Sequence, residues 1–226
     1  MPDAIKLAIY DMDKTVTRRA TYNGFLLHMA RNHAPWRLLL SPVLLFGLAL
    51  YYMKFWSRSQ LKQFSQTVMI GRRVKREDYD RYLGSHADTV LRSNIYPQIK
   101  DRLRSEKADG YRHIMATASY RLYVTAIADR LNFDAVIATE LVTDDNGYII
   151  AEIDGENCYE MAKLDKVTRW LDQQQIDRAA CYIRAYSDHV SDWPLLDYAD
   201  EAFATNPHEP LLEMALAKGW QIIDWR

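Results

Sequence analysis

The sequence has few cysteines and lacks an apolar run long enough to cross a membrane. Its two cysteines, Cys158 and Cys181, match neither a disulfide framework nor a zinc motif. The longest uncharged apolar run, 38–53, has sixteen residues, whereas a spanning helix needs roughly 20. Pro42 and Gly47 interrupt this run, and no signal peptide is recognised. We therefore expect a protein of the reducing cytoplasm, where the run is either cap core or a segment at a membrane surface.

Acidic residues are missing from one long segment. From Lys14 to Arg76 there are twelve Lys and Arg residues and no Asp or Glu. Residues 77–226 carry 27 acidic and 16 basic residues, a net charge of −11, so the overall charge of −1 hides a strong asymmetry. A cationic segment on an acidic body favours an anionic partner. We expect a phosphorylated small molecule or a lipid phosphate, and no nucleic acid.

The pattern of apolar residues predicts an α/β fold. With 49% hydrophobic and 26% charged residues, the chain is expected to be globular. Strands are predicted at 5–9, 111–116, 135–138, 179–185, 202–205 and 220–224, with a hairpin around 141–150. Helices are predicted at 21–31, 57–68, 76–92, 99–107, 120–131, 159–174, 193–198 and 210–218. This order indicates a parallel sheet flanked by helices, with an inserted helical cap.

The domain boundaries follow from the same pattern. The first strand precedes the cationic helical segment, and the other predicted strands follow it. We therefore predict a catalytic core formed by residues 1–16 and 97–226, and a basic and apolar helical cap formed by residues 17–96.

Two carboxylates, Asp11 and Asp13, come directly after the first predicted strand. Residues two apart in a strand point the same way, and open α/β sheets bind ligands at the carboxyl ends of their strands. Two carboxylates so close repel each other unless a cation or a shared proton offsets their charge. A Mg²⁺ site with phosphate is one interpretation. The other is that the two residues end the strand and cap the next helix.

Three later positions carry suitable groups in the same topology. Thr117 follows a predicted strand, where its hydroxyl and the next amides can hold a phosphate oxygen. Lys163 and Lys166 lie near the start of a predicted helix, and either can neutralise a phosphoryl group; the spacing favours Lys163.

Two further carboxylates, Asp188 and Asp192, follow the strand at 179–185. Asp192 alone is also a good cap for a helix that starts at Trp193 and Pro194. Asp188 has no such structural explanation.

The order Asp11-x-Asp13-x-Thr15, Thr117, Lys163 and Asp188-x-x-x-Asp192 resembles the four motifs of the haloacid dehalogenase superfamily. The resemblance covers essentially the whole chain and is closest to the phosphoserine-phosphatase-like branch. Within that branch, the long apolar cap is similar to that of the phosphatidylglycerophosphatase-type members. The resemblance implies a Rossmann-like core with a helical cap inserted after the first motif.

The resemblance also implies the roles of the residues. Asp11 would be the nucleophile that forms an aspartyl-phosphate, and Asp13 the general acid and base. Mg²⁺ would be held by Asp11, the backbone carbonyl of Asp13 and Asp188, with Asp192 in support. Thr117 and Lys163 would hold the phosphoryl oxygens.

One departure from the family pattern bears on the substrate. Phosphoserine phosphatases have a Glu nine residues after the nucleophile to receive the substrate ammonium, and this chain has Ala20 there, near Arg18 and Arg19. This argues against phosphoserine. Aromatic and basic residues around 36–58 are typical of segments at a lipid headgroup layer.

We therefore predict a Mg²⁺-dependent phosphatase of a lipid phosphate such as phosphatidylglycerophosphate, peripheral on the inner face of the membrane. The alternatives are a soluble small-metabolite phosphatase and a phosphoacceptor regulatory protein.

Overall fold

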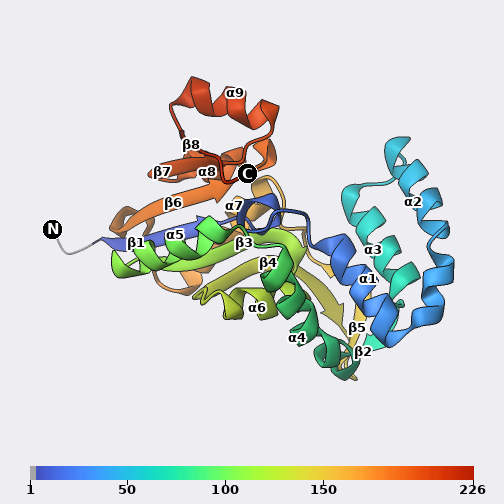
Figure 1. Cartoon of the computed structure of the whole chain (residues 1–226). Coiled ribbons are helices and arrows are strands. Elements are labelled where there is room, and N and C mark those ends of the chain that lie inside the picture. Colours follow the sequence, from blue (N-terminus) through green and yellow to red (C-terminus); the bar gives the residue numbers. More distant parts are fainter. Residues whose placement is uncertain (1–3) are drawn as a thin grey trace.

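A central mixed sheet organises the molecule, and helices pack on both of its faces (Figure 1). The computed structural model describes residues 4–226. Within this range the sheet has eight strands in the order β2-β5-β4-β3-β1-β6-β7-β8. The strands are β1 (Ile5–Tyr10), β2 (Arg73–Lys75), β3 (Arg112–Tyr120), β4 (Ala135–Thr143), β5 (Tyr148–Asp154), β6 (Cys181–Ser187), β7 (Glu201–Thr205) and β8 (Gln221–Ile223). The predicted α/β class is confirmed.

Strand β1 lies at the centre of this sheet. It pairs in parallel with β3 on one side and with β6 on the other. Its side chains are apolar on both faces, since Leu7 and Ile9 pack on one side and Ala8 and Tyr10 on the other. Residues that follow β1, β3 and β6 therefore meet at one edge of the sheet, as the sequence pattern predicts.

Helices cover the two faces of the sheet. One apolar core holds side chains of α4 (Arg76–Ser93), α5 (Pro97–Ala108) and α6 (Arg121–Arg130). The other holds side chains of α7 (Met161–Gln173), α8 (Trp193–Tyr198) and α9 (Glu209–Lys218). The helices that connect the parallel strands therefore lie on both faces of the sheet, which is the doubly wound arrangement.

The segment between β1 and α4 is helical and extends from one end of the sheet (Figure 1). It contains α1 (Tyr22–His33), α2 (Val43–Tyr52) and α3 (Arg58–Met69). Helix α3 begins with a capping box, in which Ser57 and Gln60 each bind the other's backbone N–H.

The apolar run at 38–53 does not form one buried helix. A short 3₁₀ turn, Pro35–Leu40, precedes α2, and Gly47 is the one buried residue of α2. Large apolar side chains of the run are instead exposed: Leu39 by 82%, Leu45 by 68% and Phe46 by 61%. Phe55, just after the run, is 72% exposed. Among residues 4–226 there is no helix with the length and apolar character needed to span a bilayer. Leu38 and Leu44 are half-buried and pack against the apolar core, so part of the run is cap core and part is exposed.

Several predicted boundaries were wrong. Strand β3 does not end at 116 but continues through Thr117 to Tyr120, with an irregular register against β4. Strand β4 joins the strand predicted at 135–138 to the first arm of the hairpin. Strand β2, which pairs antiparallel with β5, was not predicted because three residues give no periodic signal. Residues 1–3 of the predicted core lie outside the described range.

Beneath the site, one buried carboxylate forms hydrogen bonds to both β1 and β6. Glu106 of α5 accepts hydrogen bonds from the hydroxyls of Tyr10 on β1, at 2.6 Å, and Tyr186 on β6. The two tyrosine rings stack with centroids 4.1 Å apart, and Arg184 lies 3.3 Å from the same carboxylate. Burial opposes the charged form, but contacts with His113 and the two tyrosines outweigh it and lower the pKa of Glu106.

We expect Glu106→Leu to lower the free energy of unfolding at pH 7 by about 3–5 kcal/mol, because it leaves buried polar partners unpaired. A lowered pKa means that the folded protein binds fewer protons than the unfolded chain. The stabilisation from the ionised Glu106 carboxylate is therefore present above its ordinary pKa of 4.5 and is lost as the pH falls below that value. Urea unfolding at pH 7 and pH 4 measures both effects. The exposed Glu213→Leu is the control, and a Glu106→Leu cost below about 1 kcal/mol would contradict the account.

Candidate active site

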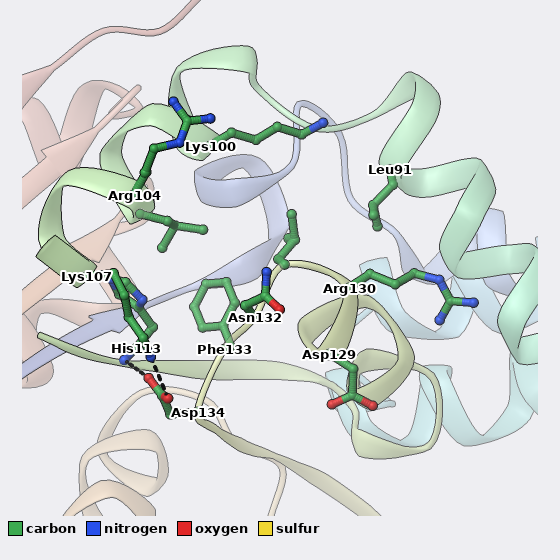
Figure 2. A pocket seen from close by; sticks show the side chains of 12 residues that line it. Leu91, Lys100, Arg104, Lys107, His113, Asp129, Arg130, Asn132, Phe133 and Asp134 are labelled. Atoms are coloured by element: carbon green, nitrogen blue, oxygen red, sulfur yellow. Dashed lines mark hydrogen bonds and ion pairs between the residues drawn. The ribbon is translucent and has the colours of Figure 1, made fainter.

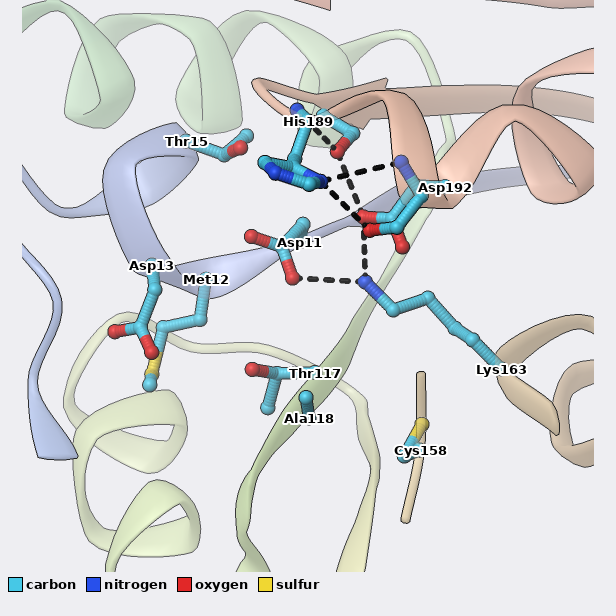
Figure 3. A network of polar contacts seen from close by, with 12 residues as sticks. Asp11, Met12, Asp13, Thr15, Thr117, Ala118, Cys158, Lys163, His189 and Asp192 are labelled. Atoms are coloured by element: carbon cyan, nitrogen blue, oxygen red, sulfur yellow. Dashed lines mark hydrogen bonds and ion pairs between the residues drawn. The ribbon is translucent and has the colours of Figure 1, made fainter. Parts of the chain in front are cut away.

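An ammonium group between two carboxylates forms the centre of the site (Figure 3). Asp11 follows β1, and its Oδ1 lies 2.8 Å from Lys163 Nζ. The same Nζ lies 2.6 Å from Asp192 Oδ2, which also accepts a 2.7 Å hydrogen bond from Ser187. Asp192 does not cap α8 with its side chain, so the alternative of a simple helix cap is excluded. Lys163 and both carboxylates are buried.

The cluster has more negative than positive charge. Burial, together with repulsion from Asp192 and Asp188, raises the pKa of Asp11 to about 8, although Lys163 opposes this. Burial and the nearby Asp192 also raise the pKa of Asp188 to about 6, against the effect of Lys14. For Lys163, attraction by Asp11 and Asp192 outweighs burial and holds its pKa above the ordinary value. A proton or a further cation is therefore needed to balance the carboxylates.

Asp13 stands beside this cluster on a wide turn, Met12–Val16, in which Lys14 adopts a positive φ of 64°. Its Oδ1 accepts hydrogen bonds from the backbone N–H and the hydroxyl of Thr21, each 2.8 Å long. Its Oδ2 accepts one of 2.9 Å from Ser119 on β3. Three donors from two segments therefore hold the Asp13 carboxylate at a set position. Two of these three donors belong to Thr21, the residue just before α1, so Asp13 also contacts the start of the next helix, as the helix-cap interpretation expects in part.

The remaining predicted residues lie on the neighbouring strands. Asp188 follows β6, is buried, and has its Oδ1 3.5 Å from the Thr15 hydroxyl. Thr117 is buried on β3, and its hydroxyl accepts a 3.2 Å hydrogen bond from Ser119 N–H. Figure 3 shows Thr117 below Asp11, on the same side as Lys163.

One cavity of about 190 Å³ is lined by all six predicted residues. Lys166, the alternative lysine, does not line it. Sequence reasoning missed Arg58, which reaches the cavity from α3 and lies with its guanidinium 4.6 Å from the ring centre of Tyr159, another lining residue. No local motif marks either of them. The lining also contains Ala20, whereas Arg18 and Arg19 are outside it. The basic residues that share this cavity with Ala20 are Lys14, Arg58 and Lys163.

The donors at this cavity fit a hard divalent cation. No three His, Cys, Asp or Glu side chains in residues 4–226 are grouped as a metal site. The predicted set needs only two side chains, Asp11 and Asp188, with the backbone carbonyl of Asp13. The excess of carboxylates, and a buried Asp192 Oδ1 without a hydrogen-bond partner among the described residues, favour an added cation.

A larger cavity of about 910 Å³ lies elsewhere, between α4, α5 and α6 (Figure 2). It contains none of the six predicted residues. Its basic residues are largely paired, since Lys107 binds Asp134 and Arg130 binds Asp88. The volume of a cavity therefore does not identify the candidate active site.

The family comparison agrees with the motif order. A model of the haloacid dehalogenase-like hydrolases matches residues 8–197. The chain belongs to the haloacid dehalogenase-like hydrolase family. This hydrolase is 27% identical over 197 residues to protein CicA of Caulobacter vibrioides, covering 86% of this chain and 83% of that protein. It spans 44 to 46% of the length of three other curated relatives that it matches, two of them named as phosphatases.

Solved structures show the same fold. A Bordetella pertussis protein of unknown function superposes with a TM-score of 0.85 at 24% identity, covering 99% of this chain and all of that one. A phosphoserine phosphatase with an analogue of its phospho-aspartyl intermediate gives a TM-score of 0.62 at 15% identity, covering 99% of this chain and 94% of that one. The hydrolase therefore has the fold of the phosphoserine phosphatases.

We expect Lys163→Met to lower the free energy of unfolding at pH 8 by about 3–5 kcal/mol in a metal-chelating buffer, because two buried carboxylates lose their cation. Raised carboxyl pKa values mean that the folded cluster binds more protons than the unfolded chain, so stability falls as the pH rises from about 4 to 8. The loss caused by Lys163→Met should shrink toward pH 4. Urea titrations across this range measure both trends.

The matched control is Lys166→Met, one turn away on the same helix. It should change the free energy of unfolding by less than about 1 kcal/mol at every pH. Equal effects of the two substitutions would contradict the ion-pair arrangement.

Proposed function

We propose that the protein is a Mg²⁺-dependent phosphomonoesterase that works through an aspartyl-phosphate on Asp11. The observation that carries this proposal is the placement of Asp11, Asp13, Lys163 and Asp188 around one small cavity. Phosphoryl transfer needs an oxygen nucleophile, positive charge around the transferred group and a proton donor for the leaving oxygen. The cavity supplies these groups from this chain.

In the first step, Asp11 attacks the phosphorus and the bond to the leaving oxygen breaks. Lys163 fixes Oδ1 of Asp11, while no hydrogen bond to Oδ2 is formed within the described residues, which leaves that oxygen for attack. Asp13 in its acid form gives its proton to the leaving alcohol. In this proposal, Lys163 and Thr117 bind the equatorial phosphoryl oxygens.

In the second step, Asp13 takes a proton from a water molecule as that water attacks the phosphorus. Inorganic phosphate leaves and the Asp11 carboxylate is restored. Mg²⁺, held by Asp11, the Asp13 carbonyl and Asp188, would supply positive charge that offsets the carboxylates and the phosphate. The three hydrogen bonds from Thr21 and Ser119 hold Asp13 in place for both steps.

We expect Asp11→Asn to lower kcat for p-nitrophenyl phosphate by at least about a thousandfold, since loss of a nucleophile removes several orders of magnitude. The variant should also take up no radiolabelled phosphate after acid quench. Asp13→Asn, by contrast, should still be labelled while turning over slowly. Residual Asp11→Asn turnover above about 1% of wild type, or labelling of that variant, would contradict the nucleophile assignment.

For the substrate, we propose a lipid phosphate presented at an anionic membrane surface. Support comes from the exposed side chains of Leu39, Phe46 and Phe55 within the cationic segment 14–76. We also propose that residues 17–96 form the cap that selects the substrate. The phosphatase-named relatives favour a second candidate, a phosphorylated metabolite.

We expect the triple variant Leu39→Ser, Phe46→Ser, Phe55→Ser to bind vesicles of phosphatidylcholine and phosphatidylglycerol at least about tenfold more weakly at low salt, because each apolar side chain loses burial. Sedimentation measures the bound fraction. Leu216→Ser with Ile222→Ser, at exposed apolar positions on α9 and β8, is the control. Absence of wild-type binding would refute the membrane proposal and favour the metabolite.

A further inference from the structure

The catalytic cavity continues into two neighbouring cavities beneath α2. A second cavity of about 300 Å³ shares Asp13, Ala20, Arg58 and Ala118 with the first. A third, of about 330 Å³, shares Asn23, Leu61 and Ser65 with the second. The three cavities therefore lie in a row, each sharing wall residues with the next, from Asp11 to the space between α1, α2 and α3. We refer to this row of cavities as the path.

The chemistry of the walls changes along this path. Next to the site, the second cavity is lined by polar groups that include Arg58, Lys62 and the hydroxyl-bearing Tyr51. Burial and the nearby Arg58 lower the pKa of Lys62 to about 7, and its Nζ donates to the backbone carbonyl of Ala118 at 2.8 Å. The third cavity is lined mostly by apolar residues, with Asn23 and Ser65 as its polar ones. The apolar residues are Leu26, Leu44, Leu45, Leu48, Leu61 and Met69.

The position of α2 explains why this groove exists. Gly47 faces α3 so closely that a Cβ atom there would lie 2.6 Å from the ring of Phe64. Leu44, Leu48 and Tyr51 are spaced on the same helix face as Gly47. They line the path together with Leu61 and Ser65 of α3. Leu48 is 38% exposed, so an apolar wall faces solvent next to a hydrolytic site. Pockets with such walls bind apolar parts of ligands.

The position of the proposed general acid, Asp13, places the leaving group on this path. In the proposed mechanism, on which this inference rests, Asp13 protonates the leaving oxygen, and Asp13 lines the second cavity. The alcohol part of the substrate therefore extends from Asp13 past Arg58 toward the leucines. We propose that the substrate is the phosphomonoester of an amphiphile, and that its unbranched alkyl or acyl chain lies in the groove between α1, α2 and α3.

Ethyl, hexyl and decyl phosphate, each below the concentration at which it forms micelles, test this groove without a membrane. Calorimetry with the Asp11→Asn protein measures binding independently of turnover. Affinity should rise by about three- to fourfold per methylene until the groove is filled. Wild-type kcat/KM should follow the same series. Equal affinity for ethyl and decyl phosphate would overturn the proposal.

Substitutions at Leu48 locate the chain. Leu48→Asp should weaken decyl phosphate binding by at least about tenfold and leave ethyl phosphate unchanged, because a charge then faces the chain. Leu48→Trp should shorten the best-bound chain by filling the groove. Leu216→Asp on α9 is the matched control for an exposed leucine. Equal losses for ethyl and decyl phosphate in Leu48→Asp would place the chain elsewhere.

Failure of this proposal and failure of the proposed function give different results. Chain-independent binding with normal hydrolysis of all three esters refutes the groove alone. Chain-dependent binding to Asp11→Asn without hydrolysis by the wild type refutes the phosphatase mechanism and supports the groove.

Discussion

The burial of three carboxylates around one lysine is the interaction on which the structure of the site depends. Asp11, Asp188 and Asp192 come from two strand ends, while Lys163 comes from a helix more than a hundred residues after Asp11. Such a cluster persists only where the surrounding fold fixes every member, because an unpaired buried charge costs several kcal/mol. The same charge excess makes the cavity suited to a cation and a phosphate together.

Contacts beneath the site fix the positions of the strands that carry these charged residues. Tyr10 precedes Asp11 on β1, and Tyr186 precedes Ser187 at the end of β6, so the stacked tyrosines lie directly under the two strand ends. Glu106 holds both hydroxyls from below. The carboxylates above and the tyrosines below are therefore positioned by the same pair of strands. Above the site, α3 contributes Arg58 and Lys62, which connect the site to the helical segment.

The sequence predicted the central architecture because its signals are local and periodic. The α/β class, most helices and the convergence of Asp11, Asp13, Thr117, Lys163, Asp188 and Asp192 on one cavity follow from strand ends and motif spacing. Their roles stay predictions. Arg58 and Lys62 were missed because their positions depend on how α3 packs against α1, α2 and β5, which no spacing encodes. Whether the apolar run at 38–53 is buried or exposed also depends on packing, since composition does not distinguish a buried helix from an exposed one.

The most direct test of the central claim is a crystal structure obtained with Mg²⁺ and a fluoroberyllate, which mimics a phosphoryl group on a carboxylate. We expect the fluoroberyllate on Asp11, the metal in contact with the Asp11 and Asp188 carboxylates and the Asp13 carbonyl, and Lys163 in contact with the mimic. A metal or a mimic bound away from Asp11, with the Asp11 carboxylate still free in the cavity, would contradict the account.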